Sequence, residues 1–172
     1  MNPSESSSGE SVGPVGVVGF GRFGQALCEL LVEAGVRVQA WDPNVKVPDD
    51  LQAIDLQQLV AGASMVVLAV PVGEVRDTLG GLRPFLTAGH CVMDVGSVKH
   101  GPIAAMAETF GRDIPWVATH PLFGPSSIAL GDRPLRAVVC PNDLHSEAVV
   151  RARALYERLG CEVIEQSADE HD

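Results

Sequence analysis

The chain has 172 residues, the size of a single globular domain that can bury a substantial core. Its 22 Asp and Glu residues outnumber its 12 Lys and Arg residues, which gives a net charge of −10. That excess of acid argues against a nucleic-acid partner, because polyanions are bound by positive surfaces. No apolar run approaches the ~20 residues of a membrane-spanning helix, and the N-terminus lacks the basic and apolar regions of a secretion signal. We therefore expect a soluble, cytoplasmic protein without a membrane partner.

The N-terminal segment and the cysteines narrow the expectations further. Residues 1–13 are rich in Ser, Gly and Glu and offer almost nothing to bury, which predicts a disordered tail. The four cysteines, Cys28, Cys91, Cys140 and Cys161, show no CxxC spacing, and three of them lie among apolar, strand-like neighbours. This pattern is typical of small core side chains, and we expect neither a disulfide nor a metal site.

The segment VGVVGFGRFG, from Val15 to Gly24, leads an apolar run into a glycine-rich turn. In a strand–turn–helix unit that binds a dinucleotide, the first glycine allows the tight turn, the second lets the backbone approach the pyrophosphate, and the third lets helix and strand pack closely. The free N–H groups of the helix then favour the phosphates. We therefore predict that the cofactor is bound by Gly19, Phe20, Gly21, Arg22, Phe23 and Gly24.

The sequence after the turn supports this prediction. Apolar residues recur with the helical period at Phe23, Ala26, Leu27, Leu30, Leu31 and Ala34, and Gly35 follows where a left-handed cap is expected. A second strand, Val36–Trp41, then leads to Asp42. This residue lies ~20 residues after the glycine turn, the distance at which an acidic side chain reaches the adenosine ribose. Asp42-Pro43-Asn44 is also a favourable turn sequence, and both interpretations can hold together.

The rest of the chain continues to alternate between strand and helix patterns. Strands are predicted at 64–70, 90–95, 114–118, 135–140 and 161–165, and helices at 51–60, 72–85, 98–110 and 144–159. The run Ser64–Val70 is continuously apolar, as in a parallel strand buried on both faces. This order predicts an α/β fold with a doubly wound, mostly parallel sheet of the Rossmann type, whose ligand lies across the carboxyl ends of the strands.

Two predicted strands end in loops that can contact a ligand. Val70-Pro71 carries no charged side chain and can lie against an adenine or ribose, although the proline alone explains why the strand ends. In DVGSVK, Ser97 and Lys99 are expected to face the crevice beside the close approach that Gly96 allows. The alternative is that Ser97 only caps the next helix and that Lys99 is only solvated.

The segment HPLFGP follows another predicted strand and places His120 at the ligand edge of the sheet. An imidazole there can accept the proton of a substrate hydroxyl while hydride leaves the same carbon, since its pKa lies near the operating pH. A lone histidine is often structural. Its position at a strand end in a nucleotide-binding fold favours the catalytic interpretation.

GFGRFG, LAVPV, DVGSVK, HPLFGP and the closing SADEHD occur in the order and spacing of one family. From about residue 14 to residue 172, the chain resembles the nucleotide-binding half of the prephenate/arogenate (cyclohexadienyl) dehydrogenases of tyrosine biosynthesis. The resemblance implies NAD as cofactor, prephenate or arogenate as the small-molecule substrate, and an oxidative decarboxylation that aromatises the ring. It further implies that His120 accepts the hydroxyl proton, that Ser97 hydrogen-bonds the same region, and that Lys99 and His171 lie at the substrate.

The chain departs from that family in two respects. Ser126-Ser127 stands where several members have an acidic residue, and the family continues past the EHD motif into a helical domain that dimerises and supplies basic substrate-binding residues. We therefore expect residues 14–166 to form the dinucleotide-binding domain and residues 167–172 to begin the connection to that domain. The isolated chain should bind NAD, be inactive alone, and self-associate weakly without the family's dimer interface. The alternatives are a stand-alone dinucleotide-binding module and another Rossmann dehydrogenase, such as a β-hydroxyacid dehydrogenase.

Overall fold

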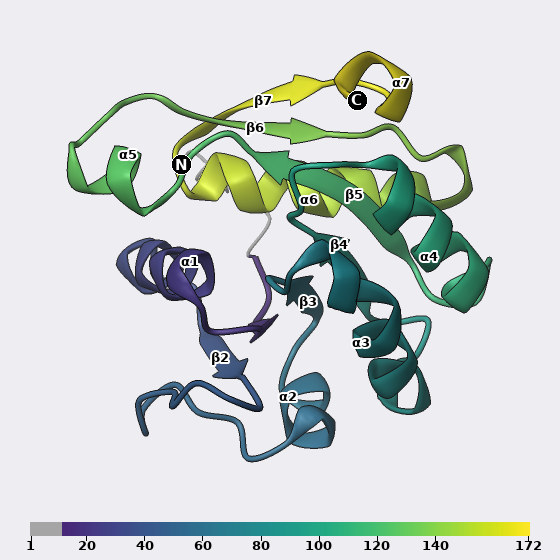
Figure 1. Cartoon of the computed structure of the whole chain (residues 1–172), viewed down its shortest axis with the longest axis horizontal. Coiled ribbons are helices and arrows are strands. Elements are labelled where there is room, and N and C mark those ends of the chain that lie inside the picture. The colour runs from purple at the N-terminus through teal and green to yellow at the C-terminus, as the bar shows by residue number, and fades with distance from the viewer. Residues whose placement is uncertain (1–11) are drawn as a thin grey trace, which may run out of the picture.

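A computed structural model of the chain describes residues 12–172. The tail predicted at residues 1–13 therefore lies almost wholly outside the described residues. Val12, which is described, packs against the apolar core. Figure 1 shows the elements in chain order, and the helices lie on both sides of one twisted sheet.

The sheet has seven strands in the order β2-β1-β3-β4-β5-β6-β7 within the described part of the chain. The strands are β1 (Val15–Val18), β2 (Val38–Trp41), β3 (Met65–Leu68), β4 (Cys91–Asp94), β5 (Trp116–Pro121), β6 (Leu135–Val139) and β7 (Cys161–Glu165). All neighbouring pairs are parallel except β5 and β6. The chain runs outward from β1 to β2 and then crosses to β3 on the other side of β1, so the topological switch point lies between β1 and β3. This confirms the predicted doubly wound, mostly parallel fold.

Helices cover each face of the sheet and create two apolar cores (Figure 1). The longer helices are α1 (Arg22–Glu33), α3 (Val75–Leu82), α4 (His100–Phe110) and α6 (Ser146–Arg158), and the shorter ones are α2 (Leu56–Ala61), α5 (Pro125–Ala129) and α7 (Ala168–His171). Leu31 of α1 and Tyr156 of α6 belong to one core, whereas Leu79 of α3 and Met106 of α4 belong to the other. Each central strand supplies both cores because its successive side chains point to opposite faces.

Several local features differ from the sequence prediction, and the helix predicted at 51–60 is shorter, forming α2 only from Leu56. Strand β5 runs to Pro121 instead of ending at residue 118, because the antiparallel strand β6 pairs Thr119, His120 and Pro121 with Val139, Val138 and Ala137. His120 therefore stands on the strand and not in a loop after it. Helix α4 begins at His100, two residues later than predicted, and α5 and α7 were not predicted at all.

All four cysteines are buried and unbridged, as expected for core side chains. Burial raises the pKa of Cys28 and Cys91 to about 12, so these thiols stay protonated at neutral pH. Within residues 12–172, no group of three or more metal-ligating side chains is present, and no helix is long and apolar enough to cross a membrane.

Candidate functional site

The glycine turn between β1 and α1 has the geometry that its sequence predicts. Gly19 has φ +104°, and a Cβ atom on it would lie 2.3 Å from the Ala69 carbonyl oxygen. A Cβ atom on Gly24 would lie 2.2 Å from the Gly19 carbonyl oxygen, which shows how closely the helix approaches the turn. A Cβ atom on Gly21 would meet nothing within 4 Å. Gly19 and Gly24 are therefore required by the fold, whereas the space at Gly21 is open to a ligand.

The start of α1 is open to an anion. Gly21 is its N-cap residue, and no side chain of the described residues caps the helix there. The backbone N–H groups of the first turn and the helix dipole therefore remain available for phosphate oxygens. Arg22 is exposed at the first helical position, whereas Phe20 is buried. Phe23 lies against Phe123, with ring centroids 6.1 Å apart, and this contact brings the turn next to the loop that follows His120.

Asp42 follows β2 and connects its end to the glycine turn. Its Oδ2 accepts a hydrogen bond of 2.7 Å from the Phe20 N–H, and its Oδ1 accepts from the N–H groups of Asn44 and Val45. Partial burial alone would raise the pKa of Asp42, but these three hydrogen bonds outweigh it and hold the pKa below its usual value. Asp42 is therefore an anion at neutral pH, and both interpretations of this segment, turn and ribose-binding site, are compatible with the structure.

Val70 and Pro71 follow β3, on the opposite side of the switch point from Asp42. Val70 is half-buried, and its Cγ1 would lie 3.2 Å from a Cβ atom on Gly19. Pro71 is exposed and precedes a 3₁₀ turn over Val72–Glu74. The structure thus brings Val70 against the glycine turn.

Lys99 is not where the sequence placed it. The side chain is fully buried, and its Nζ donates hydrogen bonds to Asp94 Oδ2 at 2.6 Å and to the Thr119 carbonyl oxygen at 2.5 Å. It neither faces the crevice nor lies in solvent, so both sequence interpretations of Lys99 were wrong about its exposure. The physical reason is the buried carboxylate at the end of β4, which requires a cation beside it.

Asp94 is the centre of this buried network, which the sequence did not reveal. Burial raises the pKa of Asp94, and the charge of Lys99 together with N–H donors from Thr119 and Gly96 opposes that rise. The Thr119 hydroxyl donates to the Asp94 carbonyl oxygen at 2.6 Å and lies 2.7 Å from the hydroxyl of Tyr156. Since the Thr119 proton is already used, Tyr156 donates to Thr119. The network fixes the strand immediately before His120.

Ser97 does not cap α4. It is exposed in a bend three residues before the helix begins, and the N-cap position is Lys99. The cap is supplied by Asp172, whose carboxylate accepts hydrogen bonds from the N–H groups of Lys99, at 2.9 and 3.0 Å, and of His100, at 2.9 Å. A contact between residues 73 positions apart cannot be read from local spacing, and for that reason the sequence suggested the nearer serine.

His120 and His171 are brought together although they lie 51 residues apart. Their rings are nearly perpendicular, with an interplanar angle of 79°, and His120 Nδ1 lies 2.8 Å from His171 Nε2. Burial, then the neighbouring His171 and Lys99, hold the pKa of His120 below its ordinary value, against the opposing charge of Asp172. At neutral pH His120 is therefore an uncharged imidazole that can accept a proton.

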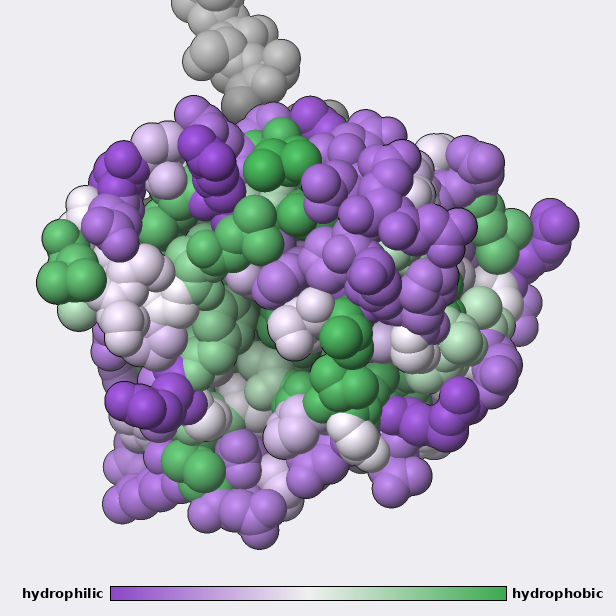
Figure 2. Space-filling model, turned by 45° about the horizontal axis from the view of Figure 1, so that its top comes forward, coloured by the Kyte–Doolittle hydropathy of each residue, from purple (hydrophilic) through white to green (hydrophobic). Residues whose placement is uncertain are grey.

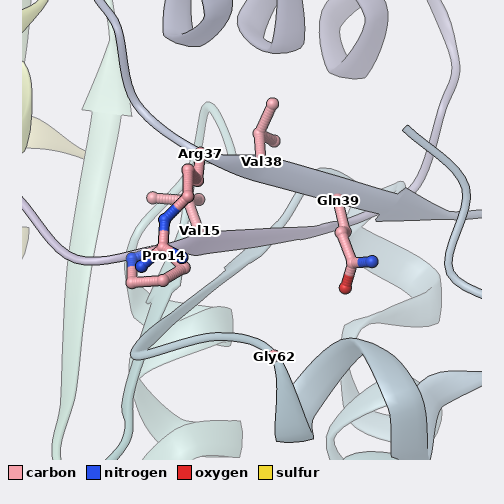
Figure 3. Close-up of a pocket in the computed structure, with 6 residues that line it drawn as sticks. All are labelled: Pro14, Val15, Arg37, Val38, Gln39 and Gly62. Carbon is pink, nitrogen blue, oxygen red and sulfur yellow. The ribbon is translucent and has the colours of Figure 1, made fainter. Parts of the chain in front are cut away.

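The site residues lie at one edge of the sheet. Gly19, Asp42, Val70 and Asp94 all end or follow parallel strands, and His120 is near the end of β5, which is parallel to them. Figure 2 shows a face of the molecule on which apolar residues border a hollow within a mostly hydrophilic surface. A separate pocket of about 280 Å³, drawn in Figure 3, lies at the starts of β1 and β2 and at the end of α2. It is therefore at the opposite end of the strands from the candidate site.

Comparison with known proteins adds a family to this geometry. A family model described as the nucleotide-binding domain of prephenate dehydrogenase matches residues 34–165. Arogenate dehydrogenase 1 (chloroplastic) of Arabidopsis thaliana is 29% identical over 172 aligned residues, which cover 92% of this chain and 27% of that protein. A probable arogenate/prephenate dehydrogenase of Methanocaldococcus jannaschii is 30% identical over 112 residues, which cover 63% of this chain and 24% of the relative.

Solved structures show the same fold. The arogenate dehydrogenase of Synechocystis superposes with a TM-score of 0.77 at 24% identity, over 92% of this chain and 61% of that one. The prephenate dehydrogenase of Aquifex aeolicus in complex with hydroxyphenyl propionate and NAD⁺ superposes with a TM-score of 0.72 at 18% identity, over 94% of this chain and 62% of that one. The matched part of the chain spans about a quarter of the length of the Arabidopsis and Methanocaldococcus relatives.

Proposed function

The chain belongs to the family of prephenate dehydrogenase nucleotide-binding domains, and we propose that it is the NAD-binding part of a prephenate or arogenate dehydrogenase. The observation that carries the proposal is the uncharged His120, held against His171 at the same sheet edge as an open glycine turn. Residues 14–166 would form the cofactor domain. Residues 167–172 would begin the connection to the helical domain that the family resemblance implies, and the relatives are longer than this chain.

The glycine turn fits a dinucleotide. The open space at Gly21 and the uncapped start of α1 suit a pyrophosphate, and the anionic Asp42 suits ribose hydroxyls. Val70 and Pro71 would lie along the nucleoside. When bound, NAD supplies the acceptor for a hydride from the substrate carbon. The chain's own part is to bind the cofactor at these residues and to present His120 beside it.

His120 would act as the general base toward the ring hydroxyl of the substrate. Its neutral ring can take the hydroxyl proton at Nε2, since Nδ1 is engaged with His171. Ser97 is exposed beside this edge and is free to contact the cofactor or substrate, as the family resemblance implies. His171 is a candidate substrate contact as well as the neighbour of His120. Lys99 is left out of this role because its ammonium group is fully buried.

The direct test is to titrate NAD into the purified chain by calorimetry and to assay prephenate and arogenate turnover on the same sample. We expect NAD to bind and neither substrate to be turned over, because a dicarboxylate or amino-acid substrate needs cationic partners that this acidic chain barely offers. Absence of NAD binding would contradict the proposed function. Robust turnover by the chain alone would show that the active site is complete without a further domain.

Replacing Gly21 with alanine should weaken NAD binding without harming the fold. The new methyl group meets nothing in the chain but enters the space of the approaching pyrophosphate. We expect a dissociation constant raised about tenfold or more, equivalent to about 1.4 kcal/mol, while the chain still unfolds cooperatively on heating. Gly80→Ala in α3, which also meets no atom within 4 Å, is the matched control and should leave NAD affinity unchanged. Equal NAD affinity of Gly21→Ala and Gly80→Ala would place the pyrophosphate elsewhere.

The chain should bind NAD at least about tenfold more tightly than NADP, a difference of about 1.4 kcal/mol. The anionic Asp42 accepts ribose hydroxyls but repels a 2′-phosphate, and the nearest cation along the chain is the exposed Lys46. Asp42→Asn should narrow the preference. Asp49→Asn removes the same charge from the same connection and should keep it. The test is to measure dissociation constants of NAD and NADP for the unaltered chain and for both variants. Equal affinities of the unaltered chain for the two cofactors would contradict the predicted preference.

A further inference from the structure

A chain of hydrogen bonds runs from the start of α4 to the candidate base. Asp172 accepts from the N–H groups of Lys99 and His100, and its Oδ1 lies 2.7 Å from Nδ1 of His171. Nε2 of His171 lies 2.8 Å from Nδ1 of His120. The side chain of His171 is 10% exposed, whereas Asp172 lies exposed at the surface, so its two backbone N–H donors rather than burial hold the carboxylate in place. The His100 amide and His171 lower the pKa of Asp172 to about 2, so Asp172 remains a carboxylate across the neutral range.

The direction of each hydrogen bond follows from this charge. A carboxylate can only accept, so His171 must carry a proton on Nδ1. A neutral His171 then has an unprotonated Nε2, which accepts from a proton on Nδ1 of His120. The remaining nitrogen of His120, Nε2, is thereby left with a free lone pair. The opposite arrangement would place a proton on Nε2 of His120 and prevent it from accepting one.

We propose that Asp172 is a positioning residue that sets the tautomer of His120 through His171, leaving His120 Nε2 as the proton acceptor. The capping of α4 is what makes this possible, because the two N–H donors of Lys99 and His100 hold the carboxylate in one orientation. His100 adds a second tie, with its Nε2 3.1 Å from Oδ1 of Asp169 in α7. The tautomer is a property of the chain itself, whereas its catalytic consequence rests on the proposed function.

Histidine ring ¹⁵N NMR of the full chain tests the tautomer without any assay of activity. In a neutral imidazole the protonated and unprotonated nitrogens resonate far apart. The spectra are recorded at about pH 8, which is above the pKa of ~6.5 of an ordinary imidazole. The chain has five histidines, and His120→Asn and His171→Gln identify the two rings of interest. We expect both rings to be protonated on Nδ1. A His120 ring protonated on Nε2 would overturn the proposal.

Asp172→Asn should invert both tautomers. The amide oxygen will stay where it accepts the two backbone N–H groups, so the amide nitrogen faces His171 and donates to its Nδ1. His171 then donates from Nε2 to His120, whose proton moves to Nε2. Asp55→Asn is the matched control, because Asp55 caps α2 through the Gln58 N–H far from these histidines. It should leave both rings unchanged.

A folded Asp172→Asn protein whose histidine spectra match the unaltered chain would also overturn the proposal. If that variant does not fold, the spectrum of the unaltered chain still decides. In the complete enzyme that carries this domain, Asp172→Asn should lower turnover on the order of 10² to 10⁴ while NAD affinity is kept. The expected tautomer without NAD binding would leave the positioning role intact and reject the proposed function. NAD-dependent turnover with the wrong tautomer would do the reverse.

Discussion

Under the proposed function, replacing His120 with asparagine should lower turnover on the order of 10² to 10⁴ in a complete enzyme carrying this domain, the usual contribution of a positioned acid–base group. Asparagine retains a polar side chain that can hydrogen-bond His171 but cannot accept the substrate proton at neutral pH. The affinity for NAD should remain nearly unchanged, since His120 lies on β5 and the cofactor residues lie at β1, β2 and β3. Steady-state kinetics together with NAD titrations measure both effects.

The pH profile provides an independent check on this role. Because the pKa of His120 is held below that of an ordinary imidazole, the neutral, active form persists to lower pH, and activity should fall only as pH drops below ~6.5. His90→Asn is a suitable control and should leave turnover and its pH profile unchanged. His90 lies before β4, at the opposite end of the strands, and its Nε2 hydrogen-bonds the Val60 carbonyl oxygen. Near-normal turnover of His120→Asn would make His120 a structural residue.

The sequence predicted well those features that depend on local pattern. The glycine turn, the helical period of α1 and the continuous apolar run of β3 each depend on neighbouring residues, and each has its expected structure. Sequence could not place Lys99, because its partners Asp94 and Thr119 come together only when β4 and β5 pair. The spacing in DVGSVK therefore suggested an exposed ammonium group where the fold buries one.

The candidate site shows the same division. His120 could be singled out because it lies at the ligand edge of a nucleotide-binding fold, but its partners depend on long-range contacts. Asp172 caps a helix that begins 72 residues earlier, and His171 meets His120 from α7, which follows β7, two strands along the sheet from β5. In the sequence, the EHD motif has meaning only as part of a family resemblance. The role that we propose for it depends on the position of α7 at the start of α4, which no local pattern encodes.

Replacing Lys99 with methionine should destabilise the fold by about 3 to 5 kcal/mol, the usual effect of removing one partner of a buried ion pair. Methionine keeps the length and apolar contacts of the side chain but leaves the Asp94 carboxylate buried without its cation. Asp94 would then keep only the N–H donors of Gly96 and Thr119. Urea unfolding monitored by circular dichroism measures the loss, with Lys46→Met, at the exposed second lysine, as the matched control.

The double variant Asp94→Asn/Lys99→Met separates the charge from the packing. A neutral amide at position 94 can still accept the Thr119 N–H and no longer needs a cation, so the double variant should recover part of the stability lost in Lys99→Met. If Lys99→Met lost no more stability than Lys46→Met, the ion pair would contribute little and Lys99 would need another role. A double variant less stable than Lys99→Met would instead show that Asp94 stabilises this edge through its hydrogen bonds rather than its charge.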